Sequence, residues 1–393
     1  MTTIRSAICE RCPPRWLLLR VETDDGEIGW GEAIGDLHDE VESALNAIGE
    51  RVEGSSIHDI TQTIETQRKT RFWRDGPVLD TALSALEMAL WDLKGKQHGA
   101  PVHDLLGGRV RERVRVYRNL WGRKPEEFAD SAREAISQSM TAVKVSPAGP
   151  TQDVVSRAAL NEMVEVVGAV REAVGPNVDL AIDLHGRLTP AASRRAVHVL
   201  APLDPFFIEE PCLPGGSASH LADLRALRTA QPIAIATGER LRSAHAFAQH
   251  LLPSPVVDII QPDVSMVGGI RASVEIGAMA AAVQVSMAPH CPYGPIQFAA
   301  SMQVAAASPA HLIQEFQSLG GAGAGGGTPG GGQNWAFDLI SEPFSIVGGH
   351  VDVPTGAGLG IEVQEERIEE HMDMWNPHPP TAWTHEDGSH AEW

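Results

Sequence analysis

The chain has 393 residues, which is too long for one ordinary domain and suits two or three. It is 43% hydrophobic and 21% charged, close to globular averages, and this excludes a disordered or fibrous protein. The net charge of −20 argues against nucleic acid or an anionic membrane as the main partner, although a bound cation could still attract a small anionic substrate.

Signals for secretion or membrane insertion are lacking in the sequence. The first residues contain no apolar run of signal-peptide length, and no segment approaches the roughly 18 apolar residues of a membrane span. The four cysteines are too few for a disulfide scaffold. We therefore expect a cytoplasmic protein with no membrane partner.

The first 115 residues predict a mixed unit of strands and helices. Strand-like stretches at 16–23 and 27–32 flank Asp24-Asp25-Gly26, an Asp-Gly turn typical of a β-hairpin. Apolar residues then recur with helical spacing. The predicted helices cover residues 41–52, 60–69 and 82–96.

From about residue 114 the pattern changes to short apolar strands that alternate with helical stretches. The eight predicted strands cover residues 114–120, 142–146, 179–185, 206–211, 233–239, 257–263, 285–290 and 312–316. This alternation implies parallel strands, and eight units imply a closed (β/α)8-type barrel rather than an open sheet. A barrel takes about 250 residues, so the N-terminal unit is the candidate for a second domain.

Ionisable residues lie at or near the C-terminal ends of seven predicted strands, about one βα unit apart. They are Lys144, Asp183, Glu209, Glu239, Asp263, His290 and Glu315. Active sites of such barrels assemble at that face, because every strand contributes side chains to it. The sequence therefore predicts one site built from these residues.

Asp183, Glu209 and Glu239 come from three consecutive strands. Three converging carboxylates repel one another unless a cation lies between them. Hard oxygen ligands suit Mg2+ and leave room for water and a bidentate substrate. We therefore predict one Mg2+ ion per subunit. The alternative is that some of these acids cap helices or form structural ion pairs.

Two histidines are predicted to flank this cluster. His185 lies two residues after Asp183, so strand alternation points it into the same cavity. His290 and Asp263 end neighbouring strands, where a hydrogen bond would fix the imidazole tautomer and raise its basicity. The pair is interpreted as a general acid and a general base. Lys144 could reach a substrate carboxylate or tune a neighbouring group, and the alternative is a surface lysine.

Two other patterns are given no site. Cys9 and Cys12 lack a second pair for zinc, and in a strand-like stretch positions three apart face opposite ways. The glycine-rich run at 320–332 lacks the context of a phosphate-binding loop. It predicts a flexible segment, either an ordinary surface loop or a flap beside the barrel mouth.

These residues resemble the enolase superfamily, in its mandelate racemase and muconate lactonizing group. Residues 82–107, ALSALEMALWDLKGKQHGAPVHDLLG, are similar to the family's signature helix and following turn. The strand ends also match, in the ordered set Asp183-x-His185, Glu209-Glu210-Pro211, Gly238-Glu239-Arg240, Gln261-Pro262-Asp263 and Ala288-Pro289-His290. The resemblance implies a modified (β/α)7β barrel at 116–340, beneath an α+β cap built from 1–115 and 341–393.

Within this group the chain looks like the sugar-acid dehydratases related to D-galactonate dehydratase. The stretches that carry this resemblance are Pro13-Pro14-Arg15-Trp16, Asp183-Leu184-His185-Gly186-Arg187, residues 290–296 and residues 385–393. The resemblance implies dehydration of an aldonate, such as D-galactonate or D-gluconate, to a 2-keto-3-deoxy acid. It also implies a homo-oligomer.

Site roles follow from the resemblance position by position. Asp183, Glu209 and Glu239 would bind Mg2+, and His290, made more basic by Asp263, would remove the proton α to the carboxylate. His185 would protonate the departing 3-hydroxyl, Glu315 would stabilise the enediolate-like transition state, and the cap loop with Arg15 would help bind substrate, as would Lys144.

Related reactions stay open as alternatives. Racemases of this group that use a lysine base place it second in a Lys-x-Lys strand, and Ser146 occupies that position here, which counts against two-base racemisation. An epimerase or cycloisomerase on the same scaffold is the first alternative. A catalytically silent relative that binds metal is the second.

Overall fold

The N-terminal region forms a small antiparallel sheet packed against helices. A computed structural model describes residues 2–35, 37–316, 339–377, 382–385 and 387–392. The sheet contains β1 (Ile4–Cys12), β2 (Trp16–Thr23) and β3 (Ile28–Ala33), in that order. The predicted hairpin is confirmed, since Thr23 N donates to Glu27 O across the Asp-Gly turn at 2.9 Å. The helices are α1 (His38–Val52), α2 (Ile60–Lys69), α3 (Pro77–His98) and the short α4 (Val102–Leu105).

The central region is a curled parallel sheet of eight strands, one for each predicted strand. They are β4 (Arg113–Asn119), β5 (Ala142–Val145), β6 (Asp179–Asp183), β7 (Phe207–Glu209), β8 (Ala234–Thr237), β9 (Ile259–Ile260), β10 (Ser286–Met287) and β11 (Gln314–Phe316). Their order is β10-β9-β8-β7-β6-β5-β4-β11, and a parallel bridge between Met287 and His311 joins the two ends. The sheet is thereby closed into a barrel.

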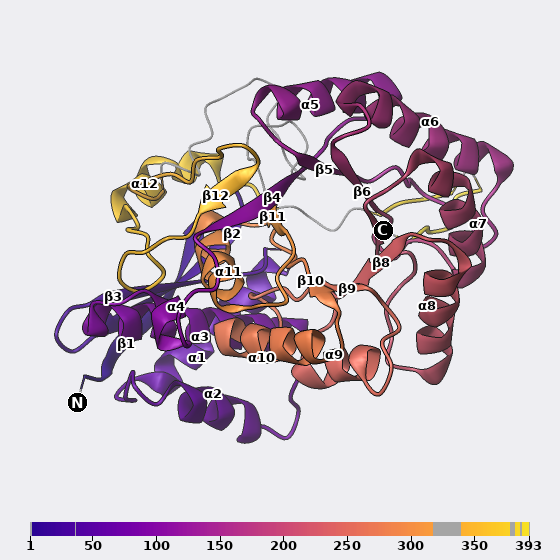
Figure 1. Ribbon diagram of the computed structural model, residues 1–393. Coiled ribbons are helices and arrows are strands. Elements are labelled where there is room, and N and C mark those ends of the chain that lie inside the picture. Colours follow the sequence, from indigo (N-terminus) through magenta and orange to yellow (C-terminus); the bar gives the residue numbers. More distant parts are fainter. Residues whose placement is uncertain (1, 36, 317–338, 378–381, 386, 393) are drawn as a thin grey trace.

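Seven α-helices separate these strands, which is the (β/α)7β arrangement that the family resemblance implied rather than the (β/α)8 barrel expected from the strand–helix alternation. They are α5 (Pro125–Ser137), α6 (Arg157–Val174), α7 (Pro190–Leu200), α8 (Ala218–Ala230), α9 (Ala244–Leu251), α10 (Gly269–Ala282) and α11 (Pro295–Ala307). Figure 1 shows α5 to α8 curving around the outside of the strands, with α9 to α11 nearer the cap. The glycine-rich run at 320–332 lies outside the described residues.

The C-terminal segment returns to the cap, where α12 (Glu365–Glu370), yellow in Figure 1, lies beside the N-terminal sheet. Glu365 forms an ion pair with Arg20 of β2 at 2.9 Å. Between barrel and cap, β12 (His350–Asp352) pairs antiparallel with β4. The predicted limits of the domains, at residues 115 and 340, stay predictions.

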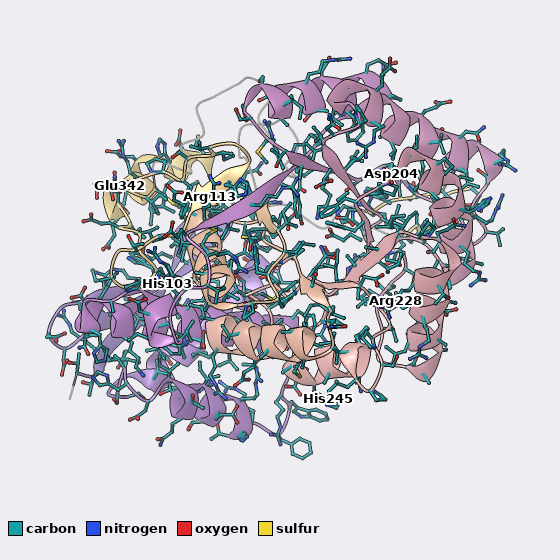
Figure 2. All side chains as sticks on the ribbon, viewed as in Figure 1. His103, Arg113, Asp204, Arg228, His245 and Glu342 are labelled. Carbon is teal, nitrogen blue, oxygen red and sulfur yellow. The ribbon has the colours of Figure 1, made fainter. Side chains whose placement is uncertain are left out.

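The cap and the barrel also meet at α4 and α11. His103 of α4, labelled in Figure 2, contacts Gln303 Oε1 through its backbone N and its ring Nδ1, at 3.0 and 2.7 Å. Along the described part of the chain, no helix is both long and apolar enough to cross a membrane.

Candidate active site

A layer of apolar side chains fills the barrel and forms the floor of the site. The cluster has one member on, or directly beside, each of the eight strands: Tyr117, Ala142, Ala181, Phe207, Ala236, Ile259, Ala288 and Ile313. Figure 2 shows side chains crowding the space inside the ring of strands. Because side chains alternate along a strand, the residues two positions later point inward one layer higher. Four of them are Lys144, Asp183, Glu209 and Glu315.

The three predicted metal ligands converge at this level. Ligand atoms of Asp183, Glu209 and Glu239 all lie within 4.8 Å of one another. Glu209 Oε2 is buried with no hydrogen-bond partner among the described residues, so it is an acceptor with a lone pair to offer. Oxygen donors in this arrangement fit a hard divalent cation. The acidic cluster can therefore bind a metal ion.

Local backbone geometry, rather than strand alternation, brings Glu239 into the cluster. The strand β8 ends at Thr237, and Gly238 follows with a φ of +142°, where a Cβ would lie 2.8 Å from Gln261 N. Only glycine fits this position, and the turn there directs Glu239 into the barrel mouth. Glu210, which directly follows Glu209 in the sequence, instead accepts hydrogen bonds from Thr237 Oγ1 and Gly238 N at 2.6 and 2.8 Å.

Lys144 lies among the carboxylates, and an exposed fraction of 3% excludes the surface-lysine alternative. Its Nζ is 2.8 Å from Glu209 Oε1, 3.3 Å from Asp183 Oδ2 and 3.1 Å from Glu315 Oε1. Burial by itself lowers the pKa of Lys144, but the surrounding carboxylates outweigh burial and raise it well above its usual range. The ammonium offsets part of the negative charge and holds the acids in place.

His290 is paired with Asp263 as the spacing predicted. Asp263 Oδ2 lies 2.7 Å from His290 Nδ1, while His290 Nε2 faces Glu239 Oε2 at 3.5 Å. Burial lowers the pKa of His290, but Glu315, Glu239 and Asp263 outweigh it and raise that pKa to about 10. A cation bound to Glu239 would weaken this effect, because it would neutralise one of the charges that raise the pKa.

His185 reaches the site by a turn, since β6 ends at Asp183 before alternation can act on it. Its backbone N donates to Asp183 Oδ1 at 2.8 Å, and its φ is +50°. Its ring Nε2 lies 3.0 Å from Asp183 Oδ2. The imidazole therefore lies beside the acidic cluster and lines the same cavity as His290.

Glu315 is held by two donors besides Lys144. Asn119 Nδ2 donates to its Oε1 at 2.7 Å, and Cys291 N donates to its Oε2 at 2.6 Å. Burial by itself raises the pKa of Glu315, but the positive charges of Lys144 and His290 outweigh burial and lower this pKa below its usual range. Asn119 was missed in the sequence, although it ends the first barrel strand and the strand-end rule would have found it.

The site opens into a cavity of about 1080 Å³ whose described walls come from both cap and barrel. Arg15 lines it from the cap, as expected, whereas Phe72 and Trp73, in the cap segment between α2 and α3, are 87% and 85% exposed to solvent. Arg187 and Trp383 also line it, and the guanidinium lies 4.4 Å from the centre of the indole ring. Trp383 was missed because nothing in its spacing links the C-terminal segment to the barrel mouth.

Comparison with known families supports this architecture. Residues 3–107 match the mandelate racemase / muconate lactonizing enzyme N-terminal domain, and residues 127–367 match the enolase C-terminal domain-like family. The chain belongs to the mandelate racemase/muconate lactonizing enzyme family. These matches confirm the resemblance to the enolase superfamily that the strand-end residues indicated.

Named relatives of this family span most or all of the chain. A D-galactonate dehydratase of Variovorax paradoxus (strain S110) is 36% identical over 98% of both chains. A D-gluconate dehydratase of Thermoproteus tenax is 36% identical over 91% of this chain and 70% of the relative. The solved mandelate racemase/muconate lactonizing enzyme from Sulfitobacter sp. is 30% identical, covers 94% and 96% of the two chains, and has a TM-score of 0.83. Homo-oligomerisation and a cytoplasmic location stay predictions.

Proposed function

We propose that the protein is a Mg2+-dependent hydro-lyase that converts an aldonate, such as D-galactonate or D-gluconate, to a 2-keto-3-deoxy acid. The observation that carries the proposal is the placement of His290, paired with Asp263, and of His185 on one cavity with a three-carboxylate cluster. The named dehydratases that are 36% identical to this chain support the same reaction class.

The difficult step is removal of the proton α to a carboxylate, because it places a second negative charge on an anion. Asp183, Glu209 and Glu239 would hold the metal ion. Bound Mg2+ would supply positive charge where the substrate carboxylate accumulates negative charge. Glu315 lies on the same side of the cavity as Lys144 and is assigned to stabilise the transition state. Arg15 and Lys144 are assigned to substrate binding.

His290 is assigned as the general base. Asp263 accepts a hydrogen bond from Nδ1–H, and this directs the lone pair of Nε2 toward the cavity. His290 would take the α-proton on Nε2, and Asp263 would stabilise the resulting imidazolium. This pairing supports proton abstraction because it fixes both the tautomer and the ring plane before substrate arrives.

His185 is assigned as the general acid. Loss of water requires a proton on the departing 3-hydroxyl, and the imidazolium of His185 would donate it from Nε2. Asp183 Oδ2 lies 3.0 Å from that nitrogen and so holds the ring beside the acidic cluster. Two histidines with different carboxylate partners can thus divide the acid and base roles.

A direct test incubates the purified protein with Mg2+ and a panel of aldonates and detects 2-keto acids with semicarbazide. We expect one or a few aldonates to react and His290→Asn to be inactive. His245→Asn is the matched control, because His245 lies on α9, labelled in Figure 2, and is exposed outside the cavity. The His245→Asn variant should form 2-keto acid at the wild-type rate.

The outcome in deuterium oxide distinguishes the alternatives. A dehydratase accumulates the keto acid, whereas an epimerase returns substrate that carries deuterium at the α carbon. Absence of keto acid from every aldonate would contradict the proposal. Metal binding without turnover or exchange would favour the catalytically silent alternative.

A further inference from the structure

A buried carboxylate of the cap reaches the barrel directly behind the base. Glu32 lies on β3 and is fully buried. Its Oε1 accepts a hydrogen bond from Gly294 N at 2.5 Å, and its Oε2 accepts one from Gln297 N at 2.8 Å. Gly294 is the residue before α11 and Gln297 lies in its first turn, so both donors are at the helix N-terminus, which favours a negative group. A Cβ at Gly294 would lie 2.7 Å from Glu32 Oε1, so only glycine allows this approach.

The side chain of Gln297 continues the contact from α11 to the base. Its Nε2 donates to Asp263 Oδ1 at 2.8 Å, and Tyr293 N donates to its Oε1 at 3.0 Å. The amide is therefore held in one orientation at both ends, with its NH2 group directed at Asp263. Gln297 is fully buried, and Asp263 is 1% exposed.

Asp263 is consequently held on both oxygens. Oδ1 accepts from Gln297 Nε2 and from Ser265 N, the latter at 2.7 Å, and Oδ2 is bonded to His290 Nδ1. A carboxylate held in this way cannot rotate without breaking a charge-assisted hydrogen bond. The direction of the imidazole ring therefore depends on groups that never touch the cavity contents.

We propose that Glu32 is a positioning residue for proton abstraction, acting through Gln297 on Asp263 and so on the ring of His290. The inference rests on the proposed function, since it takes His290 as the base. Because Glu32 belongs to the cap and its donors belong to the barrel, this contact makes the orientation of His290 depend on the packing of the cap against the barrel.

The chain contains a natural control for this role. Glu87 of α3 is also a buried cap carboxylate, and it accepts from Ile270 N and Arg271 N at the start of α10, at 2.7 and 3.0 Å. Among the described residues, no side chain of α10 bonds to Asp263 or His290. Glu87 therefore shares the burial and the helix contact of Glu32 but not its connection to the base.

The decisive experiment is a double-mutant cycle measured in the full-length protein with Mg2+. Glu32→Gln places an amide NH2 against backbone donors, and Gln297→Met removes the donor to Asp263. We expect each change to lower kcat by about 10- to 100-fold with KM little changed, because proton abstraction and not binding is impaired. The kcat of the double variant should be no lower than that of the more impaired single variant, because both changes act through the same connection. Glu87→Gln should keep the wild-type kcat.

A second measurement does not need turnover. In metal-free protein, the NMR signal of the His290 Nδ1–H proton reports its bond to Asp263, and it should shift or broaden in Glu32→Gln and Gln297→Met but not in Glu87→Gln. If no aldonate reacts, the proposed function fails while this signal still tests the positioning role.

Several results would overturn the inference. These are multiplicative losses in the double variant, equal losses of kcat in Glu32→Gln and Glu87→Gln, and an unchanged Nδ1–H signal in Glu32→Gln. Should Glu32→Gln not fold, Glu32→Asp replaces it, because its shorter carboxylate cannot reach both N–H groups and should give the same pattern.

Discussion

Replacing Lys144 by methionine should strongly destabilise the metal-free protein. The Nζ of Lys144 lies 2.8, 3.1 and 3.3 Å from three carboxylates, and each contact is worth about 5 to 6 kcal/mol at an effective dielectric constant of about 20. The net cost is smaller, because the ammonium group was itself desolvated and the acids can take up protons. Breaking a buried ion pair costs about 3 to 5 kcal/mol, and we expect a loss of that size.

The assay is urea unfolding at neutral pH, with EDTA or with excess Mg2+. The loss in Lys144→Met should be largest in EDTA and smaller in Mg2+, because a cation on the acidic cluster replaces the missing positive charge. Lys94→Met is the matched control, since Lys94 is half-buried over Trp91 and outside the site. Its unfolding free energy should change by no more than about 0.5 kcal/mol.

Equal stability of Lys144→Met and wild type in EDTA would refute this reasoning. So would a loss that is the same with and without Mg2+. Either result would mean that the ammonium group does not balance the carboxylates, and Lys144 would then be assigned to substrate alone.

Three further predictions concern the base, the metal and the barrel seam. Asp263→Asn should lower kcat by a factor on the order of 10³ to 10⁴, because an amide NH2 favours the wrong His290 tautomer; α-deuterium exchange that stays at the wild-type rate would contradict this. Mg2+ at 100 times its Kd should stabilise wild type by about 2.7 kcal/mol in thermal unfolding, with the effect lost in Asp183→Asn and kept in Asp204→Asn. Burial, with Arg111 nearby, lowers the pKa of His311 from 6.5 to about 3, so between these pH values the unfolded chain binds a proton that the folded chain does not. The unfolding free energy should therefore fall by up to about 1.4 kcal/mol per pH unit as the pH drops from 6.5 to about 3. His311→Gln should flatten this slope, and an unchanged slope would show that another group causes it.

Much of the site could be predicted from the sequence because strand alternation and the barrel topology act locally. Lys144, Asp183, Glu209 and Glu315 each lie two residues after a floor residue such as Phe207, so an apolar run followed by an ionisable residue predicted an inward side chain. The spacing of one βα unit then predicted that these side chains share one face. The same alternation distinguishes Glu209, which faces the same way as Phe207, from its neighbour Glu210.

Tertiary structure alone decided the contacts that depend on how the cap sits on the barrel and how the chain turns beyond each strand. Glu32 and Gln297 are 265 residues apart, and Trp383 meets Arg187 from the C-terminal segment, so no local pattern pairs them. Lys144 gave an ambiguous signal for the same reason, since its partners come from other strands. Periodicity reports which way a side chain faces along its own element, but distances between elements are set by packing of the whole core.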